Sequence, residues 1–283
     1  YLTQKQCDSV KEVKMYGDYP VERLDGIIYF QNLETLYLTN AHNLRTLDVS
    51  WNSALKDLSI GGCHNLTSLD LRYNPNLQEL NCTGTGLTSL DLSRNPELEI
   101  LVCAFVQMTQ LDLSKNPQIY HLNCSENQLK QLDVSNLKEL LTLDCSHNDL
   151  EQLDVKNSKI LVALNCSANQ LTELDADVTH KPNLERVECQ NNQLTSLILG
   201  QNKLLKKLNC AHNQLPQLNL NNMSALKELN CANNQLTQLN LKNMIFLKEL
   251  RCQNNQLTAL DVSSSPDLTT LVLKNNHLTS LNL

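Results

Sequence analysis

The sequence predicts a solenoid of short parallel β-strands with almost no α-helix. Alternating Leu-x-Leu or Leu-x-Cys cores are typical of strands, and the Asn or Asn-Pro that follows each core turns the chain. A fixed period of this length is typical of proteins whose coils each pack only on their neighbours. The period is 21 residues, with a single step of 23 between two runs: Cys82, Cys103, Cys124, Cys145 and Cys166, then Cys189, Cys210, Cys231 and Cys252.

Each repeat has two halves. The first reads L-x-x-L-x-C-x-x-N-x-L, as in residues 140–150, and the second reads L-D-L-S-x-N-P-x-L, as in residues 90–98. We expect residues 1–32 to form an N-terminal cap with a short helix, a first strand and a tight return path. Residues 33–283 are expected to form the solenoid, with about a dozen coils and no C-terminal cap.

Three irregularities interrupt the pattern. Two extra residues between Asp175 and Leu184 predict a bulge in one coil, and Val106 stands where its coil should carry Asn. The chain begins at Tyr1 without an initiator Met or a signal peptide, so we expect a processed product or a trimmed fragment. It stops at Leu283 in mid-repeat, so we expect either further chain or a covering partner there.

The eleven cysteines are predicted to be buried free thiols. Nine of them fill the same repeat position, so their Cβ vectors run parallel rather than toward one another, as a disulfide requires. Of the other two, Cys7 and Cys63, the second occupies the place that Asn usually holds. The sequence has no C-x-x-C pair, so we expect no zinc site.

Composition narrows the possible functions. The net charge of -7 argues against nucleic acid as the main partner, since that would need a basic face. No apolar run is long enough to span a bilayer. The seven His residues fall at unrelated repeat positions and there is no glycine-rich phosphate loop, so we expect no enzyme and no cofactor.

A column of Asp residues recurs on successive coils. Like charges on neighbouring strands repel, so either hydrogen bonds or cations must offset them. We favour hydrogen bonds and expect no required metal. The column is Asp48, Asp70, Asp91, Asp112, Asp133, Asp154 and Asp175.

These motifs resemble the leucine-rich repeat, and the 21-residue unit with an LDLSxNPx half is similar to the bacterial IRREKO subclass. The segment DGIIYFQNLETLYL, residues 25–38, resembles the start of internalin-like bacterial surface proteins. The resemblance implies a right-handed solenoid with its parallel sheet on the concave side and short strands or turns on the other side. It also implies binding of other molecules on the concave sheet, and no catalysis.

The two rows of outward positions in the first half vary from coil to coil, whereas the row before the second half is nearly uniform. We therefore interpret the varied face as the ligand-binding sheet. An exposed apolar cluster on a polar sheet is typical of an interface. The predicted binding patch is Ile100, Val102, Phe105, His121, Asn123 and Asp144, and a mixed-charge region with Arg186, Lys207 and Arg251 is the second candidate.

The function expected from the sequence is protein binding or adhesion by a bacterial cell-surface or secreted protein. Its expected partner is a protein on the surface of a host or neighbouring cell. A glycan-binding surface protein is the alternative, although the mapped rows carry only Tyr37 as an aromatic on which a sugar could stack. A cytoplasmic location is the alternative to an extracellular one.

Overall fold

The computed structural model describes residues 3–17, 20–177, 183–200 and 202–283. It divides into two compact units, residues 1–140 and 141–283, each of which is a stack of coils. The bulge predicted between Asp175 and Leu184 falls on residues 178–182 and lies outside the described residues.

The first unit begins with a short cap and continues as a parallel sheet. The cap helix starts with a capping box, in which the side chains of Thr3 and Gln6 each bond the other's backbone N–H. The elements are α1 (Gln4–Ser9), β1 (Glu12–Tyr16), the 3₁₀ helix η1 (Asp25–Tyr29), β2 (Thr35–Thr39), β3 (Asp57–Ser59), β4 (Glu79–Asn81), β5 (Ile100–Val102) and β6 (His121–Asn123).

The six sheet strands of this unit follow one another in chain order, and all their pairings are parallel. The register places leucine on leucine, with Leu80 beside Leu58 on one side and Leu101 on the other. The spacing of the leucines, 22 residues from Leu36 to Leu58 and from Leu58 to Leu80 and 21 from Leu80 to Leu101, sets this register, because a shift by one residue would turn every leucine toward solvent.

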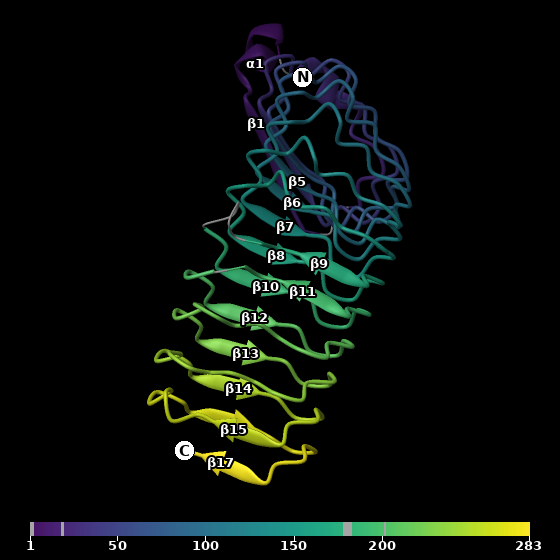
Figure 1. The fold of residues 1–283 in the computed structure, drawn as a ribbon. Helices are drawn as coiled ribbons and strands as arrows, with labels where there is room; N and C mark the ends of the chain where they lie inside the picture. Colours follow the sequence, from purple (N-terminus) through teal and green to yellow (C-terminus); the bar gives the residue numbers. More distant parts are fainter. Residues whose placement is uncertain (1–2, 18–19, 178–182, 201) are drawn as a thin grey trace. The chain divides into compact units, whose positions relative to one another are not determined.

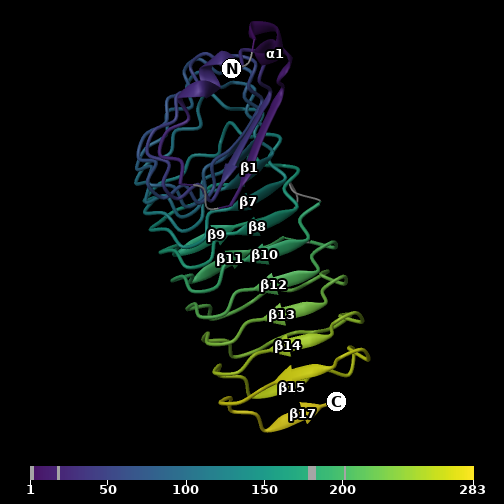
Figure 2. The same cartoon turned by 180° about the vertical axis from the view of Figure 1, so that it is seen from behind.

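The second unit has its own main sheet and two additional strand pairs, one of which, β9 with β11, is visible beside β8 and β10 in Figure 1 and from behind in Figure 2. β9 pairs with β11, and β15 pairs with β17, in the second halves of their coils. The main-sheet strands are β7 (Thr142–Asp144), β8 (Ala163–Asn165), β10 (Arg186–Glu188), β12 (Lys207–Asn209), β13 (Glu228–Asn230), β14 (Glu249–Arg251) and β16 (Thr270–Val272). The additional strands are β9 (Glu173–Asp175), β11 (Ser196–Ile198), β15 (Ala259–Asp261) and β17 (Ser280–Asn282).

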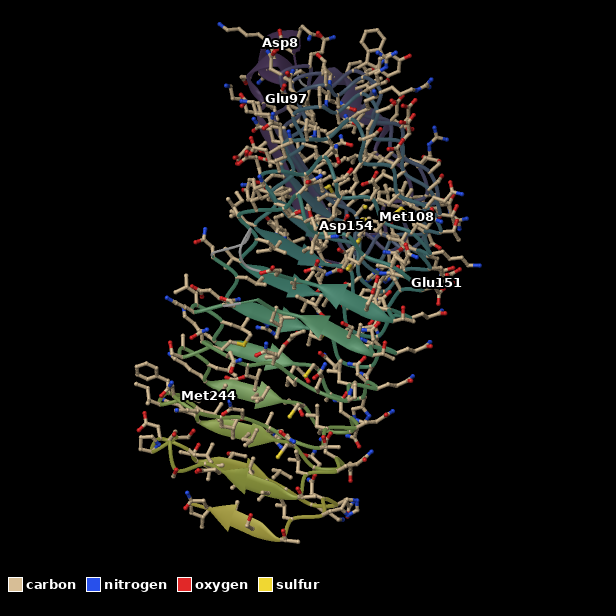
Figure 3. The ribbon with its side chains drawn as sticks, in the orientation of Figure 1. Asp8, Glu97, Met108, Glu151, Asp154 and Met244 are labelled. Carbon is tan, nitrogen blue, oxygen red and sulfur yellow. The ribbon has the colours of Figure 1, made fainter. Side chains whose placement is uncertain are left out.

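Each coil of the second unit therefore has two faces joined by two turns. Figure 3 shows Glu151 and Asp154 on one side of these coils and Met244 on the other. Met244 is 1% exposed and takes the inward position of its turn. The predicted solenoid of short parallel strands, with strands or turns on the second side and almost no helix, is confirmed.

The predicted cysteine ladder is also confirmed. All eleven thiols are free and buried. Burial raises the pKa of the Cys82, Cys166 and Cys210 thiols to about 12. Because the thiolate is the reactive form, these cysteines behave as small hydrophobic side chains.

The Asn residue at the corner after most main strands joins neighbouring coils. Nδ2 of Asn127 donates to the Cys103 carbonyl of the preceding coil at 2.9 Å and to its own Cys124 carbonyl at 3.0 Å. Its Oδ1 accepts the Met108 N–H at 2.9 Å. Backbone groups that would otherwise be buried without partners are thereby satisfied. The same pattern recurs at Asn169, Asn192, Asn213, Asn234, Asn255 and Asn276.

Earlier coils use other residues at this corner. Cys63 donates from Sγ to the Leu38 carbonyl at 3.0 Å, which is the bond to the preceding coil that an Asn would make. Thr85 donates from Oγ1 to its own Cys82 carbonyl at 2.9 Å. These coils carry a second Asn ladder at the opposite turn, formed by Asn52, Asn74, Asn95 and Asn116.

The Asp column is held by hydrogen bonds, as we expected. Oδ1 of Asp91, for example, accepts the backbone N–H of Ser93 at 3.0 Å. Asp48, Asp112, Asp133 and Asp154 each accept the N–H two residues later in the same way. Bonds from Ser93 lower the pKa of Asp91, and the Arg72 side chain lowers that of Asp70 to about 2. Asn219 and Asn240 accept the same bond without carrying a charge.

We predict that the thiols stay reduced and unreactive in the folded protein. A thiol reagent should titrate almost none of them under native conditions and all eleven after unfolding, because the thiols are buried and their pKa values are raised. Mass spectrometry of the alkylated chain gives the count. Disulfides among Cys82 to Cys252 in native protein would contradict the ladder.

A second prediction concerns acid. A carboxylate whose pKa is lowered on folding stabilises the fold above its unfolded pKa, and this stability is lost as the pH falls through its folded pKa. The melting temperature should therefore decrease between about pH 4 and about pH 2. Replacing Asp91, Asp112 and Asp133 together by Asn keeps the acceptor and removes the charge, so this variant should show a weaker acid dependence. An unchanged acid profile would show that the column has no part in it.

Candidate functional site

The candidate site lies on the solvent face of the main sheet in the first unit. Ile100 and Val102 of β5 point outward and are half-buried, whereas Leu101 between them is fully buried. Parallel register places Ile100 between Glu79 of β4 and His121 of β6. The sheet thus brings an apolar pair together among polar neighbours.

Phe105 lies just beyond β5, in a row of left-handed residues that recurs after the main strands, and it differs from the rest of the row by its large apolar side chain. Its side chain is 59% exposed, and its backbone is left-handed, with φ of 56°. A left-handed backbone costs a residue with a side chain roughly 1–2 kcal/mol, least for Asn and nothing for Gly. The other described members of the row are Gly, Ala or polar: Asn40, Gly62, Gly84, Glu126, His147, Ala168, Asn191, His212, Asn233, Asn254 and Asn275.

Val102 lacks a hydrogen bond that the neighbouring strands make. Oδ1 of Asn81 accepts the N–H of Thr83 at 3.0 Å, and Oδ1 of Asn123 accepts that of Ser125 at the same distance. Valine has no acceptor, so the N–H of Ala104, which is 4% exposed, does not gain this bond. An unmade bond at a buried donor costs free energy.

Val106 is the third departure in the same coil. It is 1% exposed and occupies the corner position that Asn127 holds in the next coil. It can donate no side-chain hydrogen bond to Cys82 or Cys103. The backbone also differs here, because Gln107 is left-handed with φ of 56°, unlike any Gln that follows a ladder Asn in the described coils.

The other predicted patch residues have more ordinary surroundings. His121 is half-buried on β6. Oδ1 of Asn123 accepts hydrogen bonds from both the N–H and the Oγ of Ser125. Asp144 lies on β7 of the second unit, where its Oδ1 accepts the Ser146 N–H and its Oδ2 accepts Nδ2 of Asn165. The structure therefore brings together Ile100, Val102 and Phe105 in one coil and His121 and Asn123 in the next. Asp144 is placed only within its own unit.

Sequence reasoning did not select the three acids beside the patch. Asp57 of β3 and Glu79 of β4 are register partners, and Glu99 immediately precedes β5. None of the three forms an ion pair within the described part of the chain. Burial raises the pKa of Glu79, and the negative charges of Asp57 and Glu99 add to this effect. The sequence could have indicated these acids, because no Lys or Arg occupies the outward rows of β3 to β6.

The secondary candidates lie in the second unit and are ion-paired. Arg186 bonds Glu188 at 2.8 Å, Lys207 lies 3.5 Å from Glu188 and 3.4 Å from Glu228, and Arg251 lies 3.9 Å from Glu249. A hollow of about 140 Å³ lies over β12 to β14. Such exposed pairs are typical of a solvated face.

A second exposed apolar residue was also missed. Ile198 of β11 is 48% exposed and takes the place of the Asp or Asn of its column. Hollows of about 420 Å³ and about 480 Å³ flank it. The sequence could have indicated this exposed residue, because Ile198 interrupts the column of Asp and Asn.

Among the described residues, no helix has the length and apolar character needed to cross a membrane. No group of three or more His, Cys, Asp or Glu side chains among them is arranged to hold a metal ion.

No protein-family model matches the chain, and no curated protein matches it. Several solved structures, however, are similar to the chain. The functional domain of InlJ from Listeria monocytogenes, which includes a cysteine ladder, is similar with a TM-score of 0.79 and 27% identity over 99% of this chain. This chain spans 64% of that domain's length.

Two other solved structures have the same fold. The internalin InlF from Listeria monocytogenes matches with a TM-score of 0.80 and 24% identity, over 100% of this chain and 89% of InlF. The leucine-rich-repeat ectodomain of a receptor kinase from Arabidopsis thaliana, in complex with Casparian strip integrity factor 2, matches with a TM-score of 0.73 and 20% identity. That match covers 91% of this chain and 36% of the ectodomain chain.

We predict that Val102→Asn stabilises the protein. The new Oδ1 should accept the Ala104 N–H, as Asn81 and Asn123 do for their own neighbours, and raise the free energy of unfolding by about 0.5–1 kcal/mol. Val102→Ala is the matched control, because it removes the same apolar surface without adding the acceptor. Thermal or denaturant unfolding of the three proteins tests this. Should the Asn variant unfold before the Ala variant, the side chain at position 102 does not reach that amide.

Proposed function

We infer that this chain, a leucine-rich-repeat solenoid with an internalin-like fold, is a non-enzymatic protein-binding module of a bacterial cell-surface or secreted protein. The solenoid exposes a long polar sheet face, and such faces bind partners in related architectures. The Arabidopsis ectodomain is itself solved in complex with another factor.

The proposal rests mainly on the exposure and the backbone conformation of Phe105. It is 59% exposed and left-handed, so neither core packing nor backbone preference accounts for an aromatic side chain at this position. Strained or sparsely populated backbone conformations that persist in a fold point to function. We propose that Phe105, with Ile100 and Val102, is the apolar anchor of the interface, because such anchors carry most of the binding energy.

A protein partner fits this patch better than a glycan. Sugars stack their apolar faces on aromatic rings, and Phe105 is the only aromatic residue among the predicted patch residues apart from the His121 imidazole, whereas Ile100 and Val102 are aliphatic and half-buried. Burial of aliphatic side chains by a partner is instead typical of the centre of a protein–protein interface. His121 and Asn123, on the neighbouring strand, would form part of its polar rim.

The likeness to InlJ and InlF supports a bacterial surface or secreted location. The cysteine ladder is compatible with that location, because buried thiols of raised pKa resist oxidation. A host or neighbouring-cell protein is therefore the class of partner that we propose.

The test uses the immobilised chain and its Phe105→Gly variant, exposed side by side to extracts of host-cell and bacterial surfaces. Glycine removes the anchor and suits a left-handed backbone, so the variant should fold at least as well as the parent. We expect at least one protein to be retained by the parent and lost from the variant, as measured by mass spectrometry. Affinity for the purified partner should fall by roughly 2 kcal/mol.

Phe246→Ala is the matched control, since Phe246 is 49% exposed in the second unit and does not have a left-handed backbone. It should retain the same partner. A partner set that is identical for the parent and Phe105→Gly would contradict the proposed site. Retention of glycans on an array, with no protein partner, would favour the glycan-binding alternative.

A further inference from the structure

The acids beside the proposed patch indicate what the partner must carry. Asp57 and Glu79 face the same side of adjacent parallel strands, which lie about 4.8 Å apart. Glu99 joins them at the start of β5. Like charges at this spacing repel, and cross-strand neighbours of the same sign destabilise a sheet.

Among the described residues, no Lys or Arg forms an ion pair with these three acids, although Lys56 interacts electrostatically with Asp57 at longer range. Lys56 is the neighbouring base, and its Nζ bonds Glu34 at 2.8 Å. Lys11 bonds the other oxygen of Glu34 at 2.7 Å. Among the described residues, Asp57 has one side-chain bond, from Oγ1 of Thr35 at 3.3 Å, and Glu79 and Glu99 have none.

We propose that the partner places an arginine or lysine against Asp57, Glu79 and Glu99 while an apolar side chain next to it covers Ile100, Val102 and Phe105. This inference rests on the proposed function and specifies the chemistry of its partner. Charge complementarity supports it, because a cation bound there would partly offset the negative charge of three carboxylates that have no ion-pair partner among the described residues.

Arginine suits this position best. Its planar guanidinium presents donors in two directions and can bond carboxylates on adjacent strands at once. The raised pKa of Glu79 agrees with this arrangement, since burial and the negative charges of Asp57 and Glu99 disfavour its ionised form. A bound cation would reverse this effect and lower the pKa of Glu79.

The acids beside the patch differ from three glutamates of the second unit's main sheet, which have cationic neighbours. There Glu188 bonds Arg186, Glu228 lies near Lys207, and Glu249 lies near Arg251. Among the described residues, Glu188, Glu228 and Glu249 therefore have cationic neighbours, whereas the three acids that border the apolar patch have no ion-pair partner.

The experiment selects a random peptide library against the intact chain, with removal of peptides that also bind the Phe105→Gly variant. We expect the selected peptides to carry Arg or Lys beside an aromatic or aliphatic residue. Synthetic peptides are then measured against the parent and against the double variant Glu79→Gln, Glu99→Gln. That variant should bind about tenfold more weakly, because a desolvated charge pair is broken.

Two controls isolate the charge. Glu97→Gln removes one negative charge in the turn before β5, in the same coil and away from the outward rows, and should leave affinity unchanged. Peptides with Arg and Lys replaced by Gln should bind the parent and the double variant equally. Titration of Glu79 by NMR should show its pKa decreasing when the basic peptide is bound.

The outcomes separate this inference from the proposed function. If binding depends on Phe105 but the peptides lack basic residues, or the double variant binds as tightly as the parent, the cationic partner is excluded and the proposed site stands. If the library yields no binder that depends on Phe105, the proposed function fails, and this inference fails with it.

Discussion

The fold depends on satisfying the backbone where each coil turns. At the corner after every main strand the chain passes through a left-handed residue and buries its amides against the next coil. The Asn side chain at the corner bonds carbonyls of two coils and accepts one N–H, as Asn127 does for Cys103, Cys124 and Met108. This linkage fixes the distance between coils, and the leucine and cysteine columns can then pack in register.

The coil from Leu98 to Met108 departs from this rule more than its neighbours do. Val102 omits a backbone bond that Asn81 and Asn123 receive, Phe105 places an aromatic side chain on a left-handed backbone, and Val106 interrupts the ladder. Each departure is expected to lower stability, and the three residues lie within a stretch of five consecutive positions. Natural proteins break local rules mostly at functional sites, so the concentration of these departures is the physical basis for placing the site here.

The fold could be predicted from the sequence because each of its rules repeats. The 21-residue step set the register, the Leu-x-Cys alternation predicted the strands, and the column of Asn predicted the corner hydrogen bonds. The apolar cluster of the candidate site was also visible as a departure from the repeat. The left-handed φ of Phe105 and the bond missing at Ala104 were not, since they depend on backbone geometry. Nor did the sequence show that Nζ of Lys56 bonds Glu34 and that Asp57 and Glu79 have no ion-pair partner among the described residues.

The central claim is that this coil gives up stability in order to bind. The most direct measurement is the unfolding temperature of the triple variant Val102→Asn, Phe105→Asn, Val106→Asn, which restores the repeat consensus, together with its affinity for a peptide that the parent binds through Phe105. The account predicts that the melting temperature rises by about 2–4 °C for each kcal/mol gained in the free energy of unfolding. It also predicts that the variant no longer binds the peptide. A variant that melts below the parent, or that binds the peptide as tightly as the parent does, would contradict it.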